Sequence, residues 1–246
     1  MRFFVTGGSR GIGAQVVLDA YRAGHDVAFT YLRNEAGARQ MLEQAHTLRP
    51  NGTCVAFQLD VRDSIATTDV TERATDALGG IDVVVANAGI NRGGLLVSVS
   101  DEDWREVIDT NLTGAFNVCR QLLPVLLAQR FGRIVFISSV GQGGGLGQAA
   151  YSASKAGLAG LSAAISKEYG RKGVTSNVLV LGVFDTAMTR DGLSQRNREF
   201  WATYCPAGRT GELAEVSQAV LFLASRDGAF INGSELRLTG GLDWIP

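Results

Sequence analysis

The chain alternates short apolar segments with stretches whose apolar residues recur at helical spacing, and this alternation is what most constrains its fold. The segments are rich in Val, Ile and Phe, and most run without polar alternation, as strands buried on both faces do. The intervening stretches of about 12–20 residues can return the chain to the start of a parallel strand. The pattern predicts an α/β fold, a doubly wound parallel sheet of about seven strands with helices on both faces. The segments are 3–6, 26–31, 54–60, 82–89, 133–139, 176–182 and 234–241.

Length and composition narrow the class of protein. The 246 residues, 46% of them hydrophobic, contain no linker or low-complexity stretch, so residues 1–246 are predicted to form a single domain. A net charge of −1 gives no electrostatic case for nucleic acid or an anionic membrane surface. No apolar run approaches the roughly 18–20 residues that span a bilayer, and the first residues are interpreted as a strand instead of a signal peptide.

The three cysteines are far apart and odd in number, which predicts neither a metal site nor a disulfide framework. We expect free thiols in a protein of the cytoplasm. Residues 186–210 are polar and mixed, which is typical of a lid or binding loop inside a compact domain.

A glycine-rich turn, "TGGSRGIG" at 6–13, follows the first predicted strand and opens a predicted helix. Glycines let the backbone approach a pyrophosphate closely, and the helix start offers free N–H groups and the positive end of a dipole. This context indicates a dinucleotide-binding turn of the Rossmann type; an ordinary tight connection is the alternative.

The residues after the second strand indicate which dinucleotide binds. Tyr31 stands where an acidic residue would hold the ribose 2′-hydroxyl of NAD. Arg33 follows it and Arg10 lies in the glycine turn, so two guanidinium groups could pair with a 2′-phosphate. We therefore predict NADP(H), with two alternatives: that both arginines are solvated surface residues, or that Glu35 occupies Arg33.

The stretch "YSASKAG" at 151–157 places Tyr151 and Lys155 four residues apart among small residues. In a helix these two side chains share one face. A free tyrosine has a pKa of about 10, and a nearby ammonium group favours the phenolate. The spacing therefore predicts a proton donor next to the charge that tunes it, whereas an isolated pair of this kind would usually be structural.

These motifs occur in a fixed order together with "LDVRD" (59–63), "NAG" (87–89), "TNLTGAF" (110–116) and "ISS" (137–139). The whole chain resembles the short-chain dehydrogenases/reductases. Within them it most resembles the 3-oxoacyl-[acyl-carrier-protein] reductases, through "NAGINRGGLL", "DEDWREVIDTNLTGAF" and "PAGRTGELAEVSQAVLFLAS".

The resemblance implies a catalytic tetrad of Asn111, Ser139, Tyr151 and Lys155. Tyr151 would be the general acid of reduction, and Ser139 would hydrogen-bond the substrate carbonyl. Lys155 would hold the nicotinamide ribose and lower the pKa of Tyr151. Asn111 would hold a water that links Lys155 to solvent.

The resemblance also implies a set of contacts to the dinucleotide. Asp60 would bind the adenine amino group, while Val183 and Thr186 would orient the nicotinamide carboxamide and the phosphates. Together with the glycine turn and the residues after the second strand, the predicted cofactor positions are Gly7, Ser9, Arg10, Gly11, Ile12, Gly13, Tyr31, Arg33, Asp60, Val61, Asn87, Ala88, Gly89, Tyr151, Lys155, Gly182, Val183 and Thr186.

Two departures from the family pattern affect the predicted site. Counting back from Tyr151 selects Ser138 as the catalytic serine, whereas counting forward along the strand from Arg133 selects Ser139. We prefer Ser139 because length changes are absorbed more easily in the following glycine loop than in a buried strand. The family has proline where this chain has Leu181, so the nicotinamide loop loses a residue that fixes φ.

The resemblance further implies partners. Arg130 and Lys172 match basic positions that bind acyl carrier protein; solvated helix-end charges are the alternative. Long helices near 111–130 and 151–170 would form a four-helix dimer interface within a homotetramer, and the C-terminal "GGLDWIP" would join another subunit contact.

The predicted function is NADPH-dependent reduction of a 3-oxoacyl thioester carried by acyl carrier protein or coenzyme A. Another small ketone or alcohol, such as a polyketide intermediate, cyclic ketone or sugar, is the alternative substrate, which the missing proline favours. A catalytically silent dinucleotide-binding subunit is the third possibility, since a fold does not establish a function.

Overall fold

The computed structural model describes residues 1–186, 189 and 195–243, and its centre is a seven-stranded sheet in which every paired neighbour is parallel. The strand order β3-β2-β1-β4-β5-β6-β7 reverses direction between β1 and β4, which confirms the predicted doubly wound sheet. The strands are β1 (Arg2–Val5), β2 (Asp26–Tyr31), β3 (Cys54–Gln58), β4 (Val83–Ala86), β5 (Gly132–Ser139), β6 (Val174–Leu181) and β7 (Glu235–Leu238).

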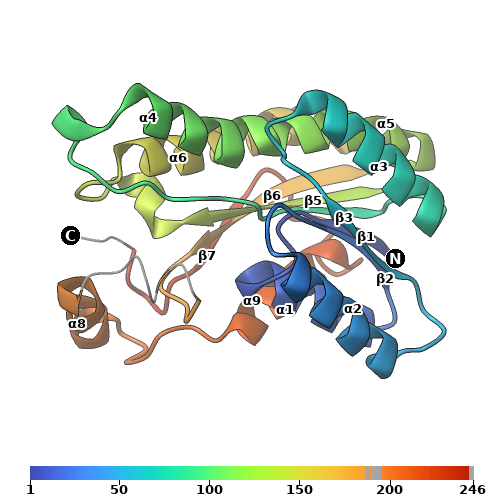
Figure 1. Ribbon diagram of the computed structural model, residues 1–246, viewed down its shortest axis with the longest axis horizontal. Coiled ribbons are helices and arrows are strands. Elements are labelled where there is room, and N and C mark those ends of the chain that lie inside the picture. The colour runs from blue at the N-terminus through green and yellow to red at the C-terminus, as the bar shows by residue number, and fades with distance from the viewer. Residues whose placement is uncertain (187–188, 190–194, 244–246) are drawn as a thin grey trace.

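Helices cover both faces of the sheet (Figure 1). On one face lie α3, α4, α5 and α6, and on the other α1, α2 and α9. Each face buries its own apolar cluster against the sheet. The helices are α1 (Gly11–Arg22), α2 (Glu35–Leu48), α3 (Ser64–Leu78), α4 (Asp101–Ile108), α5 (Gly114–Gln129), α6 (Ala149–Tyr169), α8 (Gln195–Tyr204) and α9 (Leu213–Ala224).

Local sequence signals explain where several helices begin. The Asp63 carboxylate accepts hydrogen bonds from two backbone N–H groups at the start of α3, and Asn34 caps α2 in the same way. At α9, Glu212 and Glu215 form a reciprocal capping box. None of the helices in the described ranges is long and apolar enough to cross a membrane.

The two edge strands differ from the prediction of burial on both faces. In β7, Glu235 and Arg237 are exposed while the leucines between them are half-buried, and β3 is only partly buried. A strand at the edge of a sheet has one neighbour and less helix cover, so its outward positions remain polar. The central strands β1, β4 and β6 carry nearly continuous burial, as predicted.

Because all strands run in one direction, their carboxyl ends meet along one edge of the sheet. The glycine turn follows β1, Asn87 follows β4, Ser139 ends β5 and Gly182 follows β6. Residues from four separate parts of the sequence are therefore brought to the same edge, near the point where the strand order reverses.

Candidate active site

Tyr151 and Lys155 occupy the first turns of α6, where the helix begins above the end of β5. The Lys155 ammonium nitrogen lies 5.7 Å from the centre of the Tyr151 ring. Lys155 is only 5% exposed, and its Nζ donates a 2.8 Å hydrogen bond to the backbone carbonyl of Ile137 on β5. A buried ammonium is thus held beside a phenol, as the spacing of the two residues predicted.

The two candidate serines have different surroundings. Ser139 hydrogen-bonds the Tyr151 side chain, and its Oγ accepts a 3.1 Å hydrogen bond from the backbone N–H of Gly141. Ser138 is buried, and its hydroxyl lies 2.7 Å from Gln142 Oε1 and 3.2 Å from the carbonyl oxygen of Lys155. Successive strand residues point to opposite faces of a sheet, so only one of the two hydroxyls reaches Tyr151, and it is that of Ser139.

Asn111 lies in a wide, π-helical turn, Asp109–Thr113, between α4 and α5. Its amide exchanges two hydrogen bonds with the backbone of Ile90, at 2.8 and 2.9 Å, and donates a third, of 3.0 Å, to Ser154 Oγ. A Cβ added to Gly89 would lie 3.2 Å from Asn111 Oδ1 and 3.4 Å from Lys155 Nζ. The small residue at 89 therefore leaves space between the asparagine and the ammonium.

Sequence reasoning missed Ser154, which lies within the motif "YSASK" and has no exposed surface. Its hydroxyl joins the Asn111 amide to the backbone carbonyl of Tyr151 through bonds of 3.0 and 2.7 Å. The sequence signal for Ser154 was a hydroxyl residue directly before the candidate lysine.

The pKa of Tyr151 differs from what the sequence led us to expect. Burial raises the pKa of Tyr151, and the hydrogen bond from Ser139 opposes this rise only in part. Burial also lowers the pKa of Lys155 to about 8. The expected lowering of the tyrosine pKa by Lys155 is therefore not produced by the protein environment alone, since loss of solvation outweighs the hydrogen bond from Ser139.

The glycine turn is tied to the end of β4. Thr6 Oγ1 accepts hydrogen bonds of 2.9 Å from the backbone N–H groups of both Asn87 and Ala88. The Asn87 amide in turn donates to the carbonyls of Thr6 and Gly7, at 2.8 and 3.1 Å. A Cβ at Gly13 would lie 2.3 Å from the Gly7 carbonyl oxygen, so the turn closes only with glycine there.

The start of α1 fits a dinucleotide phosphate. Arg10 precedes the helix in extended conformation, and no side chain of the described residues caps the first N–H groups. Gly7 and Gly11 both have positive φ, of 67° and 56°. Ser9 and Ile12, also predicted to contact the cofactor, are half-buried in the same turn.

At the end of β2, Tyr31 is half-buried and Arg33 is exposed, as is Arg10. Glu35 forms a 2.6 Å ion pair with Arg39, one turn further along α2, so the described contacts give Glu35 a partner other than Arg33. The edge carries two exposed guanidinium groups next to a tyrosine.

Asp60 lies at the position predicted for the adenine contact, and its carboxylate is bound by the Arg62 side chain at 2.6 to 3.0 Å. This pairing lowers the pKa of Asp60, which stays ionised as an acceptor. Its neighbour Val61 is buried and accepts a 3.0 Å hydrogen bond from Asn117 through its carbonyl.

The segment 182–186 leaves β6 towards the glycine turn. The Gly182 N–H donates to the Leu238 carbonyl, and the Val183 carbonyl accepts from the Gly211 N–H, both at 2.9 Å. Thr186 approaches the glycine turn, since its side chain would lie 3.8 Å from a Cβ at Gly11. The three predicted cofactor residues of this segment therefore border the same edge as Tyr151.

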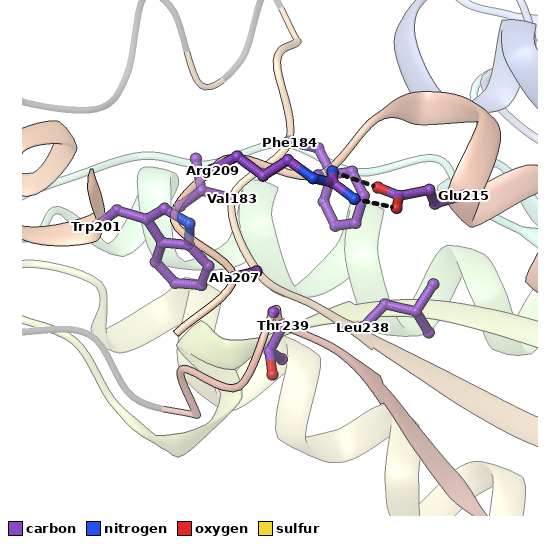
Figure 2. Close-up of a pocket in the computed structure, with 10 residues that line it drawn as sticks. Val183, Phe184, Trp201, Ala207, Arg209, Glu215, Leu238 and Thr239 are labelled. Atoms are coloured by element: carbon purple, nitrogen blue, oxygen red, sulfur yellow. Dashed lines mark hydrogen bonds and ion pairs between the residues drawn. The ribbon is translucent and has the colours of Figure 1, made fainter. Parts of the chain in front are cut away.

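A cavity of about 180 Å³ lies behind this segment, on the side of α8 and α9 (Figure 2). Arg209 and Glu215 form a 2.6 Å ion pair at its wall, and the Trp201 ring forms another wall. Tyr151 and Lys155 do not line it. Of the predicted lid at 186–210, residues 187–188 and 190–194 lie outside the described residues, as do residues 244–246 of the predicted C-terminal contact.

Arg130 and Lys172 lie at the opposite edge of the sheet from Tyr151. Arg130 ends α5 with a φ of 51° and Lys172 precedes β6, so both lie where β5 and β6 begin. Their turns are in contact, because a Cβ at Gly173 would lie 2.2 Å from the Arg130 carbonyl oxygen. The two basic residues are neighbours and exposed.

Comparison with known proteins gives the same result throughout the chain. Residues 2–197 match the family model described as short chain dehydrogenase. An acetoacetyl-CoA reductase of Rhizobium meliloti is 40% identical over 238 residues, 96% of each chain. The 3-oxoacyl-[acyl-carrier-protein] reductase FabG of Escherichia coli is 38% identical over 239 residues, 97% of this chain and 95% of the relative.

The fold comparison agrees. A crystal structure of levodione reductase superposes with a TM-score of 0.93 and 26% identity, over 98% of this chain and 97% of the other. The seven-stranded doubly wound sheet, the family match and relatives of nearly equal length lead to one conclusion: the chain belongs to the short chain dehydrogenase family and is an oxidoreductase.

Proposed function

We propose that the protein is an NADPH-dependent ketoreductase that reduces the ketone of a 3-oxoacyl thioester to a secondary alcohol. One observation carries the proposal. The Tyr151 phenol, the Ser139 hydroxyl and the Lys155 ammonium converge at the carboxyl edge of the sheet, beside a glycine turn suited to a dinucleotide.

The chain's own residues fit the cofactor. The glycine turn and the open start of α1 would hold the pyrophosphate, and Asp60 would accept a hydrogen bond from the adenine amino group. Val183 and Thr186 would contact the nicotinamide end, near Tyr151 and Lys155. When bound, the reduced nicotinamide supplies the hydride that adds to the ketone carbon.

The proton comes from Tyr151. A tyrosine phenol is protonated at neutral pH even without the rise in pKa that burial causes here, so Tyr151 has a proton to give as a general acid. Its O–H proton passes to the carbonyl oxygen as the carbon gains the hydride, and Ser139 donates a hydrogen bond to the same oxygen. Lys155 stabilises the resulting phenolate, which must regain a proton before the next turnover. Asn111, across the gap at Gly89, would hold the water that supplies this proton from solvent.

The choice of NADPH rests on Tyr31, Arg10 and Arg33. No carboxylate stands at the end of β2 to repel a 2′-phosphate, and Glu35 is paired with Arg39. The two exposed guanidinium groups could bind that phosphate through several N–H groups.

The relatives named for acetoacetyl-CoA and 3-oxoacyl-[acyl-carrier-protein] reduction support a 3-oxoacyl thioester as substrate. Arg130 and Lys172 would attract an acidic carrier protein. They lie at the start of β5 and Ser139 at its end, about 23 Å away at roughly 3.3 Å per residue. A carrier docked there would face the far edge of this chain's own sheet, so the coenzyme A thioester, which needs no docking, is the substrate to test first.

A second candidate is the reduction of a small cyclic ketone. The levodione reductase structure matches the whole chain, and Leu181 in place of the family's proline gives the nicotinamide loop freedom to take a different path. A homotetramer and a cytoplasmic location remain predictions.

The test is the loss of reduced-nicotinamide absorbance with acetoacetyl-CoA, using NADPH and NADH in parallel. We expect faster oxidation of NADPH, and a loss of about 10²- to 10⁴-fold in kcat on Tyr151→Phe with NADPH binding retained. Tight NADPH binding without turnover on acetoacetyl-CoA or a cyclic diketone would support a silent subunit instead. Preference for NADH would overturn the interpretation of Arg10 and Arg33.

A further inference from the structure

Trp201 is the residue that anchors α8 to the body of the molecule. It is 3% exposed, and the other residues of this helix are half-buried or exposed. It belongs to the same buried cluster as Cys205 and Leu242. A large aromatic ring in a mainly polar helix therefore fixes where the helix lies.

The indole of Trp201 packs directly on Gly182, the first residue after β6. A Cβ at Gly182 would lie 2.6 and 2.7 Å from Cη2 and Cζ2 of the indole, and 3.0 Å from the Cα of Thr239. The aromatic ring and the backbone that follows β7 therefore fill the space that a side chain at position 182 would need. Position 182 must be glycine for the ring to approach this closely.

The other end of the indole faces the cavity behind the segment 182–186 (Figure 2). The ring nitrogen is buried and has no hydrogen-bond partner among the described residues, and Val183 and Phe184 line the same space. Phe184 is itself buried and its ring packs against Gly211. The indole and two backbone hydrogen bonds, from Gly182 to Leu238 and from Gly211 to Val183, hold the start of the segment in place.

Leu181, the residue before Gly182, makes the contact between Trp201 and Gly182 more important for the path of the backbone. Leu181 ends β6, and unlike a proline it does not fix its own φ by a ring. The path of the segment must then be set by packing, and Trp201 is the large ring that packs on its first residue.

We propose that Trp201 is a positioning residue for the nicotinamide end of the cofactor: through Gly182 it fixes the backbone of 182–186 against which the nicotinamide binds. This inference rests on the proposed function. It predicts that the loss of the indole weakens contacts at the nicotinamide end and leaves the adenosine end intact, because Arg10, Arg33 and Asp60 lie on other strands and turns.

The experiment measures binding of two probes by calorimetry, without a ketone substrate. The first is NADPH, and the second is 2′-phospho-ADP-ribose, which has the adenosine end and the pyrophosphate but no nicotinamide. The variants are Trp201→Ala, Trp201→Phe, which keeps a smaller buried ring but lacks the two indole atoms that touch Gly182, and Trp104→Phe as the control, since Trp104 lies half-exposed on α4 away from the segment. Thermal melting of each variant establishes that it is folded.

We expect Trp201→Ala to weaken NADPH binding by about tenfold and to change the binding of the fragment by less than about twofold. Trp201→Phe, which loses the same two atoms but fills more of the space, should weaken NADPH binding by less than Trp201→Ala does, and Trp104→Phe should bind both probes as the wild type does. In turnover, the KM for NADPH should rise more than the KM for the ketone.

An equal loss for both probes, or a lower melting temperature with unchanged NADPH affinity, would overturn the inference and leave the proposed function intact. If Trp201→Ala does not fold, the same comparison is made with Trp201→Leu. A wild-type protein that binds neither probe would overturn the proposed function and the inference with it.

Discussion

The Lys155 ammonium hydrogen-bonds the carbonyl of Ile137, two residues before Ser139 on the same strand, at 2.8 Å. The charged end of a helical side chain is therefore positioned by the sheet and not by solvent. Since burial lowers the pKa of this lysine to about 8, its protonation changes in a pH range that can be measured.

The first prediction concerns stability against pH. The pKa of Lys155 is about 8 in the folded protein and near 10.5 in the unfolded chain, so between these values the unfolded state binds more protons. Stability then rises with pH in this window. The free energy of unfolding of the wild type should increase relative to Lys155→Met by about 1 to 2 kcal/mol between pH 8 and 9.5.

Urea unfolding of both proteins across this range measures the difference. The comparison with Lys155→Met cancels the other groups that titrate nearby, including the buried thiol of Cys119, whose pKa burial raises to about 12. Parallel curves for the two proteins would mean that the lysine is solvated.

The second prediction separates the two serines. Ser139→Ala removes the hydroxyl that reaches Tyr151, and should lower kcat by about 10- to 100-fold with little change in stability. Ser138→Ala removes a buried hydroxyl that bonds Gln142 and the Lys155 carbonyl, and should cost about 1 kcal/mol of stability with a smaller effect on kcat. The kinetics of both variants, with their unfolding midpoints, would show the reverse order if Ser138 were catalytic.

The third prediction concerns cofactor choice. Tyr31→Asp places a carboxylate at the end of β2, where it repels a 2′-phosphate and can bind a 2′-hydroxyl. The ratio of kcat/KM for NADPH over NADH should fall by about 10- to 100-fold, and Arg33→Ala should lower it by about tenfold. Arg73→Ala is the matched control, because this exposed arginine lies on α3 and is paired with Asp69. An unchanged ratio in Arg33→Ala would identify Arg33 as a solvated surface residue.

The fourth prediction concerns the glycine turn. A methyl group at Gly13 would meet the Gly7 carbonyl oxygen at 2.3 Å and the Asn87 amide nitrogen at 2.6 Å, and neither the backbone nor the tied amide can yield easily. Gly13→Ala should abolish measurable NADPH binding and lower the melting temperature. Gly143→Ala, which meets nothing within 4 Å, should do neither. Retained NADPH binding in Gly13→Ala would show that the turn can open.

The sequence was sufficient to predict the sheet and the glycine turn, because each depends on local periodicity or on motif spacing. The tetrad follows from the family resemblance and stays a prediction. Continuous apolar runs marked the central strands, and the spacing of Tyr151 and Lys155 placed them on one helix face. The edge strand β7 was less predictable, since its burial depends on how many neighbours a strand has and not on its own residues.

Three features of the site could not be predicted from the sequence and became clear only in the structure. The ion-pair partner of Glu35 depends on where α2 begins, because the helix must already include Glu35 for Arg39 to lie one turn away. The upward shift in the pKa of Tyr151 depends on burial, which a motif does not report. The contact of Trp201 with Gly182 joins residues from different elements, and no periodicity links them.

The hydrogen bonds that Thr6 Oγ1 accepts from Asn87 and Ala88 join positions 81 and 82 residues apart. The pairing of β1 with β2 alone therefore leaves the glycine turn incomplete, and the turn acquires its final shape only when β4 inserts beside β1. During synthesis, the glycine turn therefore leaves the ribosome before the residues that complete its hydrogen bonds have been made. If the turn binds a dinucleotide as proposed, that binding requires β4 to have paired with β1.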